Sequence, residues 1–300
     1  DSFKTYASSS KAPATITEVV QDIYKFSGYY VNMVLHKEPD TELQKGFKNI
    51  SKLKVDVCYP FLLPVYNDYE TGTITNDEFK QIINLVENYV FRRAICGIPT
   101  NSMNKTFATL FKSIKKTDYL EGVKAAFQLM DSYKRFPTDA EFEKEIVVKE
   151  VYNFRNRNYL LSKLENYKRK EYVNVDDYTI EHIIPQNTEL SNEWQKMLGE
   201  DWKEVQSKYL HSLGNLTLTG YNSELSDKPF SQKKTMEGGF NDSPIRLNDF
   251  LRKMECAVSI ISGNRRKHLL QRNQCSFKCS PMNSTLTFDQ PCFVQGSNLV

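Results

Sequence analysis

The sequence has 300 residues, of which 40% are hydrophobic and 26% are charged, and its net charge is +3. These values are ordinary for a globular protein of about two domains, and no apolar run approaches the roughly 18 residues that cross a bilayer. With no signal peptide at the start either, we expect a cytoplasmic protein without membrane contact. The small net charge excludes nucleic-acid binding through a global field, so such binding requires local basic patches.

Amphipathic helices account for the first 170 residues. Capping boxes at Thr15–Glu18 and Thr75–Glu78 begin two of them, and Pro137-Thr138-Asp139 begins a third. Apolar residues at helical spacing follow, among them Ile16, Val19, Val20, Ile23, Phe79, Ile82, Ile83, Val86, Tyr159, Leu160 and Leu164. We expect these stripes to pack as the core of a helical domain over residues 1–170.

Three polar or proline-rich stretches punctuate this region. Residues 59–64, Tyr-Pro-Phe-Leu-Leu-Pro, are expected to form a rigid apolar connector, because each proline fixes its own φ and restricts its neighbour. Arg92 and Arg93 either complement the C-terminal dipole of a helix, which we favour, or contact phosphate. Residues 168–171, Lys-Arg-Lys-Glu, are expected to be a charged linker.

The pattern changes after residue 170. Tyr178-Thr179-Ile180 begins a short strand that Pro185 ends, and Leu216-Thr217-Leu218 alternates as the second strand of a hairpin. The chain is therefore expected to be α+β and mostly α, with the N-terminal helical domain followed by a ββα-metal (HNH-like) nuclease domain over residues 171–254.

Glu181, His182, Asn215 and Asn222 form the candidate catalytic set of this second domain. Phosphodiester hydrolysis needs an activated water and a cation that stabilises charge on the phosphate. His182 suits the general base because the pKa of histidine lies near physiological pH, while carboxylate and amide oxygens from Glu181 and Asn222 suit one Mg²⁺ or Mn²⁺ ion. Adjacent strand residues face opposite ways, so Glu181 would face the metal while His182 approaches the water. Asn215 would hydrogen-bond across the loop and hold His182 in position.

Each member of the set also has an ordinary structural interpretation. A lone histidine in a strand is commonly a core or surface residue. Asn215 follows Gly214 as in a common turn, and Asn222 could be a helix N-cap. The prediction therefore depends on the order and spacing of the residues together.

The same residues resemble a known signature. Residues 181–186, Glu-His-Ile-Ile-Pro-Gln, resemble the acidic-His-hydrophobic-hydrophobic-Pro motif of HNH nucleases in the His-Me finger superfamily. Together with residues 213–218, Asn222 and residues 230–234, they resemble the C-terminal nuclease domain of GmrSD-like proteins, which are modification-dependent restriction enzymes and related phage-defence proteins. Residues 59–63, 92–97 and 158–165 resemble the helical segment that precedes that domain, so the resemblance covers most of residues 15–250.

The resemblance implies the same roles for His182 as general base, Asn215 as its support, and Glu181 and Asn222 as metal ligands. It adds three positions that contact nucleic acid: Lys233, Lys234 and His211. For the two lysines the alternative is a solvated helix face, and His211 could equally be structural. Full-length relatives carry an N-terminal domain that binds and hydrolyses nucleotide. This sequence lacks it and begins with Asp1, so we expect a C-terminal portion of a longer protein.

The predicted function is a metal-dependent endonuclease that acts on DNA in modification-dependent restriction or phage defence. Two alternatives stay open, a non-catalytic interaction module with a decayed site and an RNA-cutting, toxin-like nuclease. Residues 255–300 lose apolar periodicity and are expected to be an atypical, disordered tail. Cys275 and Cys279 near His268 match the spacing of a zinc site only weakly.

Overall fold

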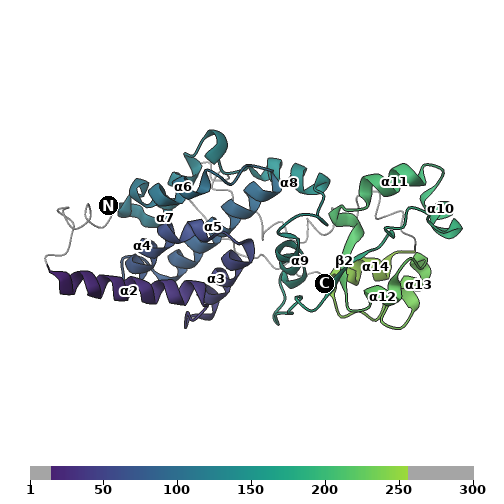
Figure 1. The fold of residues 1–300 in the computed structure, drawn as a ribbon, viewed down its shortest axis with the longest axis horizontal. Helices are drawn as coiled ribbons and strands as arrows, with labels where there is room; N and C mark the ends of the chain where they lie inside the picture. Colours follow the sequence, from purple (N-terminus) through teal and green to yellow (C-terminus); the bar gives the residue numbers. More distant parts are fainter. Residues whose placement is uncertain (1–14, 256–300) are drawn as a thin grey trace, which may run out of the picture.

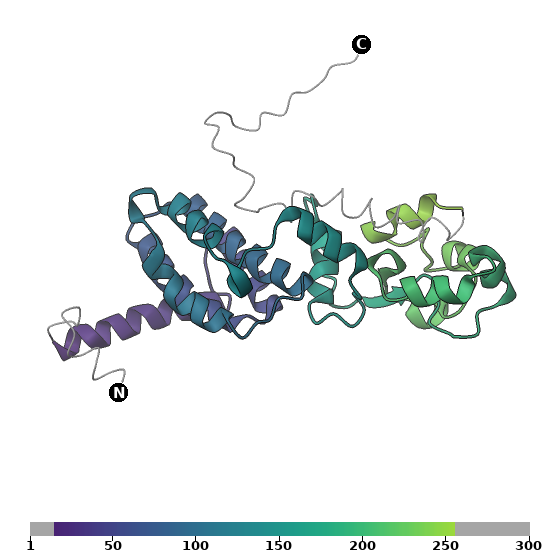
Figure 2. The same ribbon diagram turned by 90° about the horizontal axis from the view of Figure 1, so that it is seen from above.

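The computed structural model describes residues 15–255, and the predictions made for the tail and its cysteines lie outside them, apart from Glu255. This part of the chain is a mostly helical α+β structure with one two-stranded antiparallel sheet (Figure 1). The longer helices gather at one end, and the sheet and several short helices lie at the other, as the turned view also shows (Figure 2). None of its helices combines the length and the apolar character that a membrane span requires.

The α-helices and strands have the following bounds: α2 Ile16–Val34, α3 Thr41–Leu53, α4 Tyr59–Glu70, α5 Asn76–Ile95, α6 Met103–Leu110, α7 Tyr119–Gln128, α8 Asp139–Val148, α9 Arg157–Asn166, β1 Thr179–His182, α10 Asn192–Leu198, α11 Trp202–Tyr209, β2 Leu216–Thr219, α12 Asn222–Leu225, α13 Phe230–Thr235 and α14 Asp249–Lys253. Short 3₁₀ turns lie between some of them: η1 Asp56–Cys58, η2 Phe111–Ser113, η3 Lys116–Asp118, η4 Ser132–Lys134, η5 Leu213–Asn215 and η6 Arg246–Asn248. The predicted helical N-terminal region is confirmed.

Helix starts were predicted correctly wherever the signal was local. Thr15 and Thr75 both form complete capping boxes with the glutamate three residues later, and Thr138 caps α8. In each case a side-chain oxygen accepts a hydrogen bond from a backbone N–H that the helix leaves unpaired. Helix α5 then runs through the middle of the bundle, in contact with α3, α4, α7 and α8.

The predicted connector at residues 59–64 is wrong, because this segment begins helix α4. Pro60 lies in the first turn, where no N–H is needed within the helix. Pro64 removes one helical hydrogen bond, but Phe61, Leu62 and Val65 around it are completely buried. Burial of this apolar face offsets the lost hydrogen bond.

The predicted core position of the first apolar stripe is also wrong. Ile16, Val20 and Ile23 are 78%, 60% and 62% exposed. The N-terminal part of α2 projects beyond the bundle (Figure 2), so nothing in the described chain covers this face. Only the later part of α2 packs, where Met33 is fully buried.

Arg92 and Arg93 lie in the last turn of α5, as the favoured interpretation expects, and the alternative of a phosphate contact is wrong because both side chains are buried. Both donate to backbone carbonyls of loops outside the helix: Arg92 to Pro137, and Arg93 to Tyr133 and Pro99. Arg92 also pairs with Asp139. The two guanidinium groups therefore fasten α5 to the segments before α6 and α8, and they offer no surface to phosphate.

Among residues 15–255, the buried apolar side chains form two clusters, and residues of the sheet or directly after it belong to each. Leu216 and Leu218 of β2 belong to the large cluster of the helical part. Ile183 and Ile184, directly after β1, belong to a smaller cluster with Trp194. Strand β1 therefore runs from one core to the other. A domain boundary near residue 170 stays a prediction.

Candidate active site

Alternation along strand β1 separates the two central residues of the candidate site. In the antiparallel register, Glu181 lies opposite Thr217 and His182 lies opposite Leu216. Neighbouring strand residues point to opposite faces of the sheet. The contacts agree, since Glu181 meets Lys233 of α13 whereas His182 meets Tyr152 and His211.

His182 lies in a small aromatic cluster. Its Nε2 atom is 3.1 Å from Nδ1 of His211, and its ring meets the Tyr152 ring edge-on at 4.5 Å. Tyr152 stacks on His211, and the Arg157 guanidinium lies over the Tyr152 ring. Backbone bonds fix the arrangement, because the N–H groups of Val151 and Tyr152 both donate to the His211 carbonyl. The imidazole is thus held by parts of the chain on either side of β1.

Burial controls the charge of His182. Its side chain is almost fully buried, and burial, together with His211 and Lys233, lowers the pKa of His182 to about 4. A buried imidazole disfavours its charged form, and nearby positive groups add to that effect. His182 is therefore neutral at physiological pH, which is the state that a general base requires.

Glu181 forms a buried ion pair. Its Oε1 atom is 2.6 Å from Nζ of Lys233, which also donates to the backbone carbonyls of His182 and Ile183. Burial raises the pKa of the Glu181 carboxyl and lowers the pKa of the Lys233 ammonium, while their contact offsets both shifts. The pair ties α13 to the end of β1, directly beneath the backbone of His182.

Asn215 holds the chain just after His182. Its amide oxygen accepts from the Ile184 N–H at 2.7 Å, and its amide nitrogen donates to the carbonyls of Ile184 and Leu210. The side chain is completely buried and bridges β1 to the segment that carries His211. This is the kind of bond across the loop that was expected of Asn215, although it reaches His182 only through the backbone.

Asn222 is exposed at the first position of α12, a helix of four residues that contacts β1. Its amide nitrogen donates to the Ile180 carbonyl at 3.4 Å. The order strand, strand, helix is present, but α12 and α13 are both short. A ββα-metal fold therefore stays a prediction.

The donor chemistry fits a hard divalent cation, because a carboxylate and an amide oxygen are the ligand types that Mg²⁺ takes from proteins. Within residues 15–255 no group of three or more His, Cys, Asp or Glu side chains is placed to hold a metal. The assignment of Glu181 and Asn222 as metal ligands stays a prediction. Lys233 already neutralises one oxygen of Glu181, so a cation would share that carboxylate with the ammonium group.

The predicted nucleic-acid contacts divide into two kinds. His211 is half-buried beside His182. Lys233 is fully buried and Lys234 donates to the Met254 carbonyl, so both ammonium groups are used inside the protein. The placement of Lys233 argues against the predicted phosphate contact, since a buried and paired ammonium has no free surface.

Sequence reasoning missed Tyr152. It lies 30 residues before His182 in the printed sequence and outside the predicted nuclease domain. A lone tyrosine between two helices carries no local signal, and only the fold brings it against both histidines. The same applies to Lys233 as the partner of Glu181.

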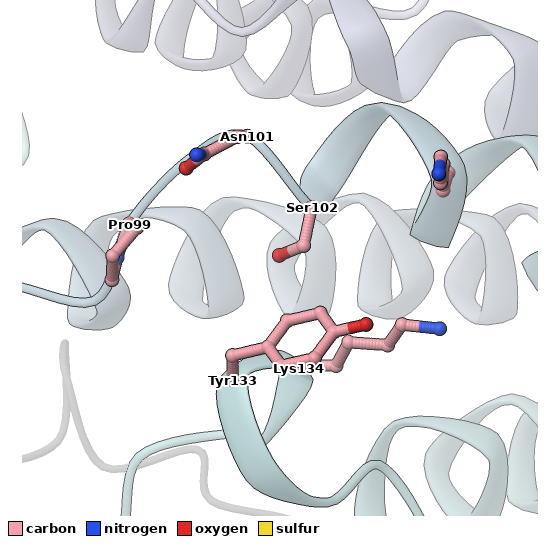
Figure 3. A pocket seen from close by; sticks show the side chains of 6 residues that line it. Pro99, Asn101, Ser102, Tyr133 and Lys134 are labelled. Atoms are coloured by element: carbon pink, nitrogen blue, oxygen red, sulfur yellow. The ribbon is translucent and has the colours of Figure 1, made fainter.

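A separate cavity of about 380 Å³ lies at the start of α6. Figure 3 shows Tyr133 and Lys134 on one side of it and Ser102 and Asn101 on the other. Arg93 donates hydrogen bonds to two residues that line the cavity, the Pro99 carbonyl and the Ser102 hydroxyl. These hydrogen bonds give the buried Arg93 guanidinium a structural role beside the cavity. Neither His182 nor His211 lines this cavity.

Comparison with known proteins identifies the region that contains the site. No curated protein and no solved structure matches the chain. Residues 136–267 match a family described as GmrSD restriction endonucleases, C-terminal domain. The match includes Tyr152, both histidines, Glu181 and Lys233, and it indicates a restriction endonuclease-like nuclease. Over these residues the chain is therefore similar to the C-terminal domain of GmrSD restriction endonucleases.

Proposed function

We propose that this chain is a metal-dependent, HNH-type endonuclease that hydrolyses DNA in modification-dependent restriction or phage defence. The observation that carries the proposal is the pair Glu181 and His182 on opposite faces of β1, with a neutral His182 at the strand end. A carboxylate on one side and a neutral imidazole on the other supply a cation ligand and a base to the same phosphodiester. The family match supports the choice of a nuclease reaction.

His182 is proposed to take the proton from the attacking water. If its Nε2–H donates to Nδ1 of His211, the Nδ1 atom of His182 keeps its lone pair. This tautomer is the one that the role requires, because it leaves Nδ1 free to accept the proton of the water. His211 and Tyr152 then hold the ring, and Asn215 holds the backbone that follows it. Thus His211 is proposed to orient the base.

Glu181 and Asn222 are proposed to hold one Mg²⁺ or Mn²⁺ ion. When bound, such an ion stabilises negative charge on the phosphate and the leaving oxygen. Lys233 positions the Glu181 carboxylate and partly neutralises its negative charge. The proposed substrate is DNA, and a nucleotide-hydrolysing domain outside this chain is proposed as a further partner. The alternatives of a non-catalytic module and an RNA-cutting enzyme are tested by the same experiment.

Plasmid nicking tests this proposal. We expect supercoiled DNA to be nicked with Mg²⁺ or Mn²⁺ and to stay intact when EDTA removes the metal, because both proposed ligands are oxygen donors for a hard cation. A labelled RNA is incubated in parallel. Cleavage that continues in EDTA contradicts the metal requirement, and cleavage of RNA alone favours the RNA-cutting alternative. A chain that cuts neither under any metal condition contradicts the catalytic proposal.

The acid limb of the pH profile gives a second test. Because the pKa of His182 lies at about 4 instead of 6.5, we expect the nicking rate to change little as the pH falls from about 8 to about 5.5. An unshifted histidine would lose about tenfold over that interval. The measurement is the initial rate at saturating metal, with His211→Ala beside the wild type. Removing His211 takes away one cause of the lowered pKa of His182. The acid limb of the pH profile of the His211→Ala variant should therefore move to higher pH. A wild-type limb near pH 6.5 contradicts the assignment.

A further inference from the structure

A basic groove lies between helices α3 and α9, away from the histidines. Its cavity is about 270 Å³, and it is lined by six cationic side chains and by no aspartate or glutamate. Helix α9 lies between α3 and β2 in Figure 1, and contacts through η6 connect it to β2. The groove therefore joins the helical part of the chain to the part that carries the candidate site.

Four of the six cations are partly neutralised by carboxylates behind the lining. Lys163 is 2.5 Å from Glu87, and Arg169 pairs with the buried Glu165. The remaining two of these four, Lys45 and Lys52, have more distant and exposed partners at 3.9 and 3.5 Å. Exposed ion pairs of this kind contribute little and are easily exchanged for another anion.

Lys168 and Lys170 are different. Both are exposed, and neither has a carboxylate within 4 Å among the residues described. Glu171 follows them in the chain but does not line the groove. Two positive charges at the rim are thus available to an anionic ligand.

The loop that carries these lysines is held in shape and is not a loose linker. The Asn166 side chain bridges it, because its Oδ1 accepts from the Val173 N–H at 2.7 Å and its Nδ2 donates to the Val173 carbonyl at 2.9 Å. Lys168 has a φ of 51°, in the left-handed region that costs a lysine free energy, and the Arg169 N–H closes the turn on Asn166. A fixed loop loses less entropy when a ligand binds.

Two tyrosines complete the rim. Tyr172 is 57% exposed, and Tyr167 lies beneath the Lys168 ammonium at 5.3 Å from the ring centre. Exposed lysines interleaved with tyrosines are typical of surfaces that follow a phosphodiester backbone. The volume is at the small end for an enclosed small-molecule site, which favours an open track.

We propose that this groove, with Lys168 and Lys170 at its rim, binds the phosphodiester backbone of duplex DNA at a distance from the scissile bond. The inference rests on the proposed function for its choice of DNA. It assigns to the loop a role in affinity and not in chemistry. Since the contacts are to phosphate, they are independent of base sequence.

Fluorescence anisotropy with a labelled duplex, in EDTA so that no cutting occurs, tests the inference. We expect the full chain carrying Lys168→Gln and Lys170→Gln to bind about tenfold more weakly at low salt, with the slope of log K against log salt smaller by about 1.8. The charge-conserving pair Lys168→Arg and Lys170→Arg should restore binding. Circular dichroism checks that each variant is folded.

Lys112→Gln with Lys115→Gln is the matched control, because these two lysines are also exposed and lie outside the groove. Equal loss in the control pair would show a general charge effect and overturn the inference, as would wild-type affinity in the Lys168 and Lys170 variant. Stronger binding of single-stranded RNA through the same lysines would overturn the choice of DNA. A chain that binds DNA through them and never nicks contradicts only the proposed function.

Discussion

Replacing His182 with alanine is expected to lower the plasmid nicking rate by about 10²- to 10⁴-fold, which is the usual contribution of a general base. The change removes the imidazole that burial keeps neutral and that contacts His211 at 3.1 Å. Binding of DNA measured without metal should change little, because the side chain is almost fully buried and contributes little surface. The measurement is the initial nicking rate beside the duplex affinity of the same preparation.

His36→Ala is the matched control for this substitution. His36 is less buried than His182 but likewise contacts one side chain through a ring nitrogen, 2.9 Å from the Ser51 hydroxyl, and it lies in the helical part. It should nick at the wild-type rate. If His182→Ala unfolds the protein, His182→Asn keeps a planar polar group and repeats the test in a folded chain. Nicking at the wild-type rate by a folded His182 variant would show that His182 is a packing residue.

Replacing Lys233 with methionine is expected to lower the free energy of unfolding by about 3–5 kcal/mol at neutral pH. Lys233 is fully buried, and its loss leaves the Glu181 carboxylate without a counter-charge in an apolar setting. It also removes donors to the carbonyls of His182 and Ile183. The midpoint and slope of urea unfolding measure the change.

The cause can be separated from simple loss of packing. Adding Glu181→Leu to Lys233→Met removes the uncompensated charge and should recover a large part of the loss. In the single variant the pKa of Glu181 is raised further, so the folded state binds the proton more readily than the unfolded state. Its stability should therefore be greater at acid pH and fall as the pH rises.

Lys234→Met, which loses only a bond to Met254, should cost about 1 kcal/mol. A loss that is unaffected by Glu181→Leu would refute the ion-pair explanation.

Local signals predicted the elements, and distant contacts decided how the polar residues are used. The capping boxes at Thr15 and Thr75 involve residues three positions apart, so the sequence alone shows both partners. The alternation of β1 and β2 likewise predicted the hairpin and the opposite faces of Glu181 and His182. Each of these depends on a periodicity that is visible in a short window.

The failures share a different cause. Lys233 and Glu181 are 52 positions apart, and Arg92 and Asp139 are 47 apart, so their burial depends on packing that no window contains. Pro64 ends a helix by local rules, yet the apolar face of α4 keeps it helical. The exposed stripe of α2 has the pattern of a core helix but extends past the bundle. Residue type and spacing therefore indicated the candidate set, while the partners of each member required the fold.

The contacts of Tyr152 limit how such a domain can be exchanged between proteins during evolution. Glu150 forms an isolated bridge with Ser212, and the next two residues bind the His211 backbone, so the segment before α9 is fastened to the site from outside the sheet. A recombination junction at residue 171 would separate Tyr152 from both histidines. A junction before residue 136, where the family match begins, would transfer all three together. A unit that keeps these contacts is thus longer than the hairpin and its flanking helices, and it includes α8 and α9.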